Sequence, residues 1–515
     1  MKNLKIILLT FIGLTFYTCD LEEDPIFLDA EATYADLQVA RGALDGIYQQ
    51  LSSYMAMEQR IFVLNGFSGL FVTKKNGNSN NNVNNINLFS LKPTYDRDSQ
   101  NMWQGMYAAI GRCNGAIANI TTYDSPTEAS ELGFNDIAGQ AYFVRAWSYL
   151  NLVRLWEDIP LWLELPDSDN LAKPKTLAKD VYAQIILDAQ MATGLINGNT
   201  GAGYPKQYAA NMLLAKVYMT LATNPSLRAD GISEAQYWQM AYDEAILAYG
   251  QYSLVADYSS LFTDEFENST ESIFELQLAQ DAANSQMGRN FTPFKYKLGQ
   301  HFGWLQVSAD VLLDHMATYP DDPRIDGSYI YEYNRADNGN LIQHYPAITN
   351  RTPFTKGHPF LFKFVEKDTQ HSNQFGDQNL IIYRYADLLL MLAEISNELQ
   401  NDQQLGYVTE VLDRVGMSND AYLGGQSSFR DAIMNEYRYE LIGEGEDAHN
   451  NRRRGFDYFL TNTINKHNNN PIFSPNVDLT LSTDPNQVMK LPIPLTEINS
   501  LKISRSEELI NPYKV

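Results

Sequence analysis

Apolar residues recur at steps of three and four along most of this chain, and this spacing strongly restricts what the chain can fold into. Between residues 30 and 54, for example, Leu37, Leu44 and Leu51 fall on one face of a helix. The same period predicts further helices at 100–120, 134–157, 176–195, 205–223, 233–250, 308–317, 384–400, 403–415 and 426–443. The chain is therefore predicted to be mainly α-helical.

Four of these helices are expected to form two hairpins in series, 134–157 with 176–195 and 205–223 with 233–250. Small and large residues alternate along the second pair, as they do in tetratricopeptide helices, at Ala209, Ala215, Tyr218, Ala241 and Ala245. Small side chains on one helix allow the next helix to approach closely. Generic helix packing would leave a similar pattern, so the serial arrangement is the main argument for a tetratricopeptide-like scaffold of helix pairs.

Long stretches without a helical period separate the helices, at 74–98, 251–304 and 319–379. The first contains "NGNSNNNVNNIN", and the other two are rich in Tyr, Phe, Gly, Pro, Asn and Asp. Loops this long in a compact protein are usually functional or disordered, and abundant aromatic residues argue against disorder. The segment "ESIFELQLA" (271–279) alternates as a strand does. We therefore expect one helical unit with large irregular loop insertions and a few short strands.

The first 29 residues resemble an export signal and a tether rather than part of the fold. Lys2 and Lys5 precede a run of about a dozen apolar residues, which is shorter than the ~20 residues that a membrane-spanning helix needs. Cys19 follows this run, so 1–18 is expected to be a lipoprotein signal peptide and 19–29 a lipidated acidic tether. Two or three acyl chains on Cys19 would hold the protein firmly at a membrane, at ~0.8 kcal/mol per buried CH₂.

Tyr17 and Thr18 depart from the usual lipobox, which leaves open a buried N-terminal cysteine behind an ordinary signal. If Cys19 carries lipid, Cys113 has no partner and the chain forms no internal disulfide. The formal net charge of −24 argues against binding to nucleic acid or to anionic membranes through basic patches. Membrane contact is therefore expected through the lipid anchor only. The 32 tyrosines combine flat apolar faces with polar tips, which suits sugar rings as well as hydrophobic cores.

Four stretches carry the most distinctive motifs, and they contain "FVRAWSYLNLVRLWEDIP", "RYADLLLMLAE", "EYRYELIGEGE" and "LPIPLTEI". In this order they resemble the SusD/RagB family of outer-membrane nutrient-binding lipoproteins. Members of that family carry an F-x-R-A helix ending in Ile/Val-Pro, an R-Y-A-D helix, an E-R-x-x-E-L-x-x-E-G helix before a basic turn, and a late L-x-P-I-P. The residues that carry the resemblance are Phe143, Arg145, Ala146, Ile159, Pro160, Arg384, Asp387, Ala393, Glu394, Glu436, Glu440, Leu441, Glu444, Gly445, Leu491, Pro494, Glu497 and Ile498.

This resemblance implies a SusD-like fold of four tetratricopeptide-like helix pairs, covered in part by an irregular ligand-binding region. It also implies an outer-membrane, cell-surface location and a SusC-like TonB-dependent transporter as partner, over which the protein sits as a lid. The acids Asp20, Glu22, Glu23 and Asp24 resemble the export signal of such lipoproteins. We expect a single domain over 30–515, with helical parts at about 30–250 and 380–515 and a loop-rich ligand-binding part at about 251–379 plus 74–98.

The chain also departs from the family pattern at a few positions. Gln140 stands where an acid is common, Glu157-Asp158 replace an expected glycine, and Tyr437 replaces an arginine. We expect these changes to affect helix packing and ion pairs rather than a ligand.

Surface capture of a sugar needs flat apolar rings for its C–H groups and Asn, Gln, Asp or Arg side chains for its hydroxyl groups. The family does not define its ligand residues by a motif, so the candidates come from the loops. The strongest is Trp304, in "GRNFTPFKYKLGQHFGWLQ" (288–306), with a core tryptophan as the alternative. Trp103 and Trp147 lie in helical patterns and are expected in the core. The further candidate ligand residues are Tyr296, Phe291, Phe302, Arg289, Asn290, Tyr95, Asn80, Asn81 and Asn82.

The sequence contains no G-x-S-x-G, H-E-x-x-H, Walker or Rossmann motif. Two carboxylates suited to glycoside hydrolysis would occur by chance among 62 acidic residues, so their presence would not indicate an enzyme. Glu436, Glu440 and Glu444 have helical spacing and basic neighbours, which favours a structural ion network. We therefore expect no enzymatic activity and no cofactor. Binding of calcium at Asp321-Asp322 and Asp326 is left open, although the sequence contains no EF-hand loop.

The expected function is that of a lipoprotein that binds oligosaccharides or polysaccharide and delivers them, unaltered, to the transporter. One alternative is a surface binder of peptides or other nutrients for the same type of transporter. Another is a tetratricopeptide-type protein-interaction scaffold, which would not need some 100 residues of aromatic-rich loop.

Overall fold

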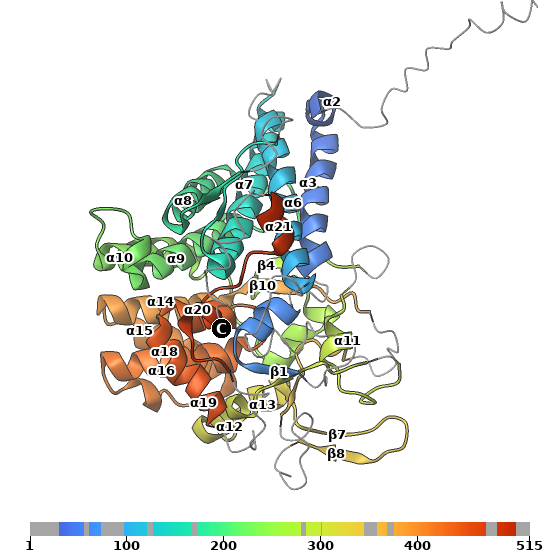
Figure 1. Cartoon of the computed structure of the whole chain (residues 1–515), viewed down its shortest axis with the longest axis vertical. Helices are drawn as coiled ribbons and strands as arrows, with labels where there is room; N and C mark the ends of the chain where they lie inside the picture. Colours follow the sequence, from blue (N-terminus) through green and yellow to red (C-terminus); the bar gives the residue numbers. More distant parts are fainter. Residues whose placement is uncertain are drawn as a thin grey trace, which may run out of the picture.

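Helix pairs form one side of the molecule and the irregular segments gather on the other (Figure 1). The computed structural model describes residues 30–55, 61–73, 97–120, 127–166, 173–279, 285–299, 301–344, 358–367, 375–469 and 481–500. The residues named above that lie outside these ranges are Lys2, Lys5, Tyr17, Thr18, Cys19, Asp20, Glu22, Glu23, Asp24, Asn80, Asn81, Asn82 and Tyr95. Among the helices of the described ranges, none has both the length and the apolar composition needed to cross a bilayer.

The predicted helices are present with boundaries close to those expected, which confirms the mainly α-helical fold. They are α2 (Ala30–Ala35), α3 (Leu37–Met55), α6 (Arg97–Ile120), α7 (Glu128–Trp156), α8 (Ala178–Leu195), α9 (Gln207–Thr223), α10 (Glu234–Ala248), α12 (Ala309–Thr318), α14 (Tyr385–Leu399), α15 (Gln404–Val415) and α16 (Gln426–Leu441). Shorter helices are α11 (Met287–Phe291), α13 (Pro323–Ser328), α17 (Asp447–Arg453), α18 (Phe456–Phe459), α19 (Asn465–Asn468), α20 (Pro485–Val488) and α21 (Leu495–Ser500).

The first predicted helix is divided in two at Asp36. The Asp36 carboxylate accepts hydrogen bonds from the main-chain N–H groups of Gln38 and Val39, at 2.8 and 3.1 Å. An aspartate in this position satisfies donors that the first turn of a helix leaves without partners, so it starts α3 as a new helix.

Helix α7 is the centre of the scaffold. It starts at a capping box in which Thr127 and Ser130 satisfy each other's main-chain donors, and nearly all of its residues from Gly133 onward are buried. The burial follows from its neighbours, because α3, α6, α8 and α9 all pack against it. The two predicted hairpins, α7 with α8 and α9 with α10, are both present (Figure 1). Trp103 and Trp147 are buried, as expected for core residues.

The irregular segments contain short two-stranded antiparallel sheets rather than one large sheet. The predicted strand at 271–279 is β4 (Ser272–Leu276), which pairs with β10 (Leu380–Arg384) beside the helices. The other pairs are β1 (Phe71–Thr73) with β5 (Leu305–Val307), β2 (Ile159–Pro160) with β3 (Lys175–Thr176), β6 (Tyr329–Ile330) with β9 (Phe360–Leu361), and β7 (Glu332–Asn334) with β8 (Leu341–Gln343). These pairs tie the loops to one hydrophobic core that runs from Tyr34 to Ile498.

A buried ion network joins the C-terminal helices to the loops. Glu440 lies between Arg324, Arg384 and Arg414, and Glu444 binds Arg384 at 2.7 Å. The glutamate row of α16 is therefore structural, as its spacing indicates. Arg384 and Asp387 lie three residues apart, a spacing at which two side chains can face one another, but the structure separates them. Arg384 points to the glutamates, whereas the Asp387 carboxylate lies 2.7 Å from the Lys216 amine.

Candidate functional site

Two aromatic rings of the predicted ligand-binding loop lie face to face. The ring centroids of Phe302 and Trp304 are 4.7 Å apart with an angle of 11° between the ring planes, and both rings are partly exposed. The loop is held against the end of α11, because the N–H groups of Phe302 and Trp304 donate to the carbonyl oxygens of Arg289 and Asn290, at 2.9 and 2.8 Å. We call this Phe302–Trp304 pair the aromatic platform.

Gly303 allows the two rings to meet. Its φ is +51°, and a Cβ atom at this position would lie 2.7 Å from Cε1 of Phe360 and 3.1 Å from Cα of Pro293. A side chain is therefore excluded by the backbone conformation and by the surrounding atoms. The left-handed backbone at Gly303 forms the turn in which the two flanking rings stack on one another. The glycine between two aromatic residues is thus the local cause of the platform.

A cation lies beside the platform. The guanidinium carbon of Arg289 is 4.5 Å from the ring centroid of Phe302 and 6.0 Å from that of Phe375. Attraction between a cation and an aromatic face holds a side chain in such a position. Flat apolar rings next to guanidinium donors match the C–H face and the hydroxyl groups of a sugar ring.

Two of the sequence candidates are turned inward. Phe291 and Asn290 have no exposed surface, and the Phe291 ring packs edge-on against Phe71 with centroids 6.1 Å apart. Both side chains are therefore closed to a ligand at the surface. The helical register of α11 is the reason, since Arg289 alone of these three neighbours remains partly exposed.

Tyr296 lies in a different place from the platform. Its ring packs edge-on against Tyr333, with centroids 5.6 Å apart, and it lines a separate groove of about 620 Å³. The same groove contains Lys367, whose amine donates to the carbonyl oxygens of Phe362 and Val365 at 2.6 and 2.8 Å. Burial lowers the pKa of Lys367 to about 7. The sequence offered no signal for this groove, because its walls come from distant segments.

Carboxylates from distant segments meet at a point that sequence spacing could not reveal. Oxygens of Asp264, Glu366 and Asp377 lie within 4.8 Å of one another. Such exposed acidic groups are common without a metal ion. Of the acids left open above as calcium ligands, Asp322 binds Arg324 and His315, at 2.7 and 2.9 Å, and Asp326 accepts a hydrogen bond from Tyr331, whereas Asp321 is exposed.

Comparisons with known sequences agree with this architecture. The sequence model of the SusD family matches residues 270–502, and a second model, described as "Starch-binding associating with outer membrane", matches residues 68–219. The SusD-like protein P25 of Formosa agariphila is 25% identical over 97% of this chain and 97% of its own length. The chain therefore belongs to the SusD family.

Solved structures show the same fold. A SusD homologue from Bacteroides thetaiotaomicron superposes with a TM-score of 0.76 at 19% identity, covering 93% of this chain and 98% of the other. Surface glycan-binding protein A from Bacteroides fluxus gives a TM-score of 0.71 at 19% identity, covering 91% and 97%. These two likenesses extend over the helix pairs and the loop segments together.

Proposed function

We propose that this protein is a cell-surface lipoprotein that binds oligosaccharides on the aromatic platform. The observation that carries this proposal is the stacked, partly exposed pair Phe302 and Trp304 with Arg289 beside it. Aromatic faces bind the apolar faces of sugar rings, and a guanidinium group donates to hydroxyl groups. The glycan-binding name of the Bacteroides fluxus neighbour and the starch-binding description of one family model support the ligand class.

The proposed role is delivery without chemistry. Cys19 would anchor the chain to the outer membrane through lipid, and a SusC-like TonB-dependent transporter would receive the glycan. The outer-membrane description of the family model supports this location. Co-isolation of the native protein with such a transporter from outer membranes is the direct test of the partner.

Replacement of Trp304 tests the site. Trp304→Ala is expected to weaken binding of the cognate glycan, found in a glycan screen, about tenfold, which corresponds to ~1.4 kcal/mol. Isothermal titration calorimetry measures the affinity, and thermal denaturation shows whether the variant stays folded. Trp162→Ala is the matched control, since Trp162 is also partly exposed but lies outside the platform, next to Lys173. Unchanged glycan binding by folded Trp304→Ala would contradict the assignment.

The nutrient class is tested in the same experiment. A peptide library screened beside the glycans would identify a peptide binder if only peptides bind and Trp304→Ala weakens them. Release of shortened sugars during prolonged incubation would instead reveal an enzyme and refute delivery without chemistry.

A further inference from the structure

The groove that contains Tyr296 is a hollow separate from the aromatic platform, and no residue of the platform lines it. It has a volume of about 620 Å³, and its walls come from residues 257–263, 296–298 and 362–367 together with Ala336. We call it the Tyr296 groove. Pockets for small ligands typically have volumes of about 300–1,000 Å³, so the groove is large enough for sugar units.

One part of the groove carries a carboxylate and hydroxyl groups. Asp257 begins the short helix η3 (Tyr258–Phe262), and its carboxylate accepts hydrogen bonds from the Ser259 N–H group and the Ser260 hydroxyl, at 3.1 and 2.6 Å. The Thr263 hydroxyl donates to the carbonyl oxygen of Ser260, at 2.8 Å. Carboxylate oxygens accept more than one hydrogen bond each, and a hydroxyl oxygen that donates can still accept. Because Asp257 is exposed and the hydroxyl residues are partly exposed, this part offers acceptors to a ligand that brings donors.

Apolar surface lies beside these acceptors. The partly exposed Tyr296 ring is held edge-on by Tyr333, and its hydroxyl has no hydrogen-bond partner within the described part of the chain. Leu298 lines the same groove and is 65% exposed. A single exposed leucine is ordinary, but here it adjoins an aromatic ring in a groove lined with acceptors. A ring and an aliphatic chain together can cover the C–H face of a sugar.

The charged groups of the groove favour an uncharged ligand. Its two lysines direct their amines to main-chain oxygens: Lys297 donates to the carbonyl oxygen of Glu366, and Lys367 donates to two carbonyl oxygens. Burial lowers the pKa of Lys367 to about 7. The carboxylates of Asp257 and Glu366 line the same groove. Two acids and two lysines leave no surplus of positive charge that would attract an acidic ligand.

Hydroxyl donors, an apolar face and no charge are the properties of a neutral sugar. We propose that the Tyr296 groove is a second carbohydrate site, which binds uncharged sugar units through the ring of Tyr296 and the acceptors of Asp257 and Ser260. This inference takes its ligand class from the proposed function, but it requires no contact with the platform. Glu366 also lines a small hollow whose wall includes Arg289, so the groove and the platform are neighbours.

Calorimetric titration of the purified full-length protein with defined oligosaccharides tests this proposal. The uncharged probes are maltohexaose, cellohexaose, laminarihexaose, xylohexaose and mannohexaose, and hexagalacturonate is the charged comparison. At least one uncharged probe is expected to bind saturably, and to bind more tightly than hexagalacturonate. Absence of saturable binding by all the uncharged probes would overturn the second site, whereas the platform is judged on the glycan found in the screen.

Two variants locate the binding in the groove. Tyr296→Ala is expected to weaken binding of the uncharged probe about threefold, and Tyr296→Phe should restore it because the ring remains. Leu298→Ser should weaken binding about twofold, since it removes apolar contact with the sugar. Leu423→Ser is the matched control, because Leu423 is 63% exposed and lies outside the groove. Thermal denaturation shows whether each variant stays folded.

Comparison with Trp304→Ala separates the two sites. If folded Tyr296→Ala and Leu298→Ser keep full affinity while Trp304→Ala loses it, the groove is overturned and the platform stands. If the groove variants lose affinity and Trp304→Ala does not, the groove stands and the platform is contradicted. Groove variants that weaken hexagalacturonate as strongly as the uncharged probe would refute the preference for uncharged sugars. Groove variants that weaken only peptides from the library would refute a carbohydrate site.

Discussion

The guanidinium of Arg145 meets the carboxylate of Asp188 through two parallel hydrogen bonds, Nε to Oδ2 at 2.7 Å and Nη2 to Oδ1 at 2.6 Å. Both side chains are almost completely buried, and the pair joins α7 to α8. Asn114 of α6 accepts a third hydrogen bond from Arg145, at 2.9 Å. The first helix hairpin is thus held by a fully satisfied polar contact as well as by apolar packing.

Removal of one partner from this pair is expected to be costly. Arg145→Met should lower the free energy of unfolding by about 3–5 kcal/mol, because the buried Asp188 carboxylate keeps its hydrogen bond from Gln184 but loses its cation. The double variant Arg145→Met/Asp188→Leu should recover much of this loss, since it removes both buried charges. Urea denaturation followed by circular dichroism measures both values. A double variant no more stable than Arg145→Met would show that the loss comes from packing rather than from the unpaired charge.

The pH dependence of stability should contain a contribution from Asp447. Burial raises the pKa of this carboxyl group to about 7 in the folded protein, from an ordinary value of 3.8. Between these values the folded chain holds a proton that the unfolded chain has released. Stability from this group therefore falls as the pH rises from about 4 and is lost above about pH 7.

Asp447→Asn tests this sign. The amide cannot ionise and keeps an oxygen that can accept the hydrogen bond from the Gly443 N–H group. The variant should be more stable than the unsubstituted protein at pH 8, by on the order of 1–3 kcal/mol, and the difference should shrink toward pH 4. Urea midpoints measured across this range give the difference directly. A difference that is constant with pH would show that Asp447 is ionised in the folded protein.

Glu157 occupies a backbone conformation suited to glycine, with φ +68° and ψ −105° at the end of α7. Residues with a side chain pay of order 1–3 kcal/mol in such regions. Glu157→Gly and Glu157→Ala both remove the ion pair to Lys490, but only glycine relieves the backbone. We expect Glu157→Gly to be more stable than Glu157→Ala by about 1 kcal/mol in thermal or urea denaturation. Equal stabilities would mean that the backbone adjusts without cost.

The proposed lipid anchor depends on Cys19. Cys19→Ala is expected to fold and bind glycan normally but to leave the membrane fraction, because no acyl chain can be attached. Cell fractionation with immunodetection measures its distribution, and the unsubstituted protein serves as the control. Continued membrane association of the variant would contradict anchoring through lipid.

Local patterns made most of the scaffold predictable. Periods of three and four marked the long helices, small residues such as Ala209 marked the close helix contacts, and the ordered set of motifs indicated the family. A helix forms its main-chain hydrogen bonds within one segment, and the residues of its buried face recur at regular intervals in the sequence. Its position can therefore be predicted from neighbouring residues. The sequence also placed Trp304 and Phe302 among the candidate ligand residues, because both lie in one aromatic-rich loop.

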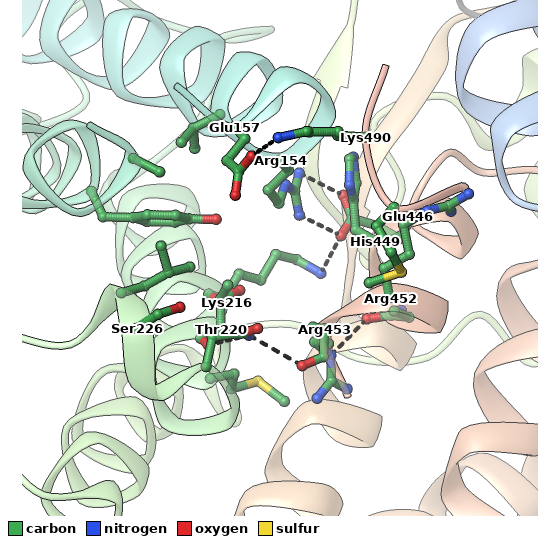
Figure 2. A pocket seen from close by; sticks show the side chains of 18 of the residues that line it. Arg154, Glu157, Lys216, Thr220, Ser226, Glu446, His449, Arg452, Arg453 and Lys490 are labelled. Atoms are coloured by element: carbon green, nitrogen blue, oxygen red, sulfur yellow. Dashed lines mark hydrogen bonds and ion pairs between the residues drawn. The ribbon is translucent and has the colours of Figure 1, made fainter. Parts of the chain in front are cut away.

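Contacts between distant segments were decided only by the tertiary structure. The spacing of Arg384 and Asp387 would allow an ion pair between them, yet Arg384 binds Glu440 and Glu444 in the folded protein. Tertiary packing also buries Phe291 in the core. A cavity among the scaffold helices brings Arg154 together with His449 and Lys490, which no sequence interval relates (Figure 2). Which charges meet depends on how whole helices pack, and that packing is determined by the summed burial of many side chains rather than by any one motif.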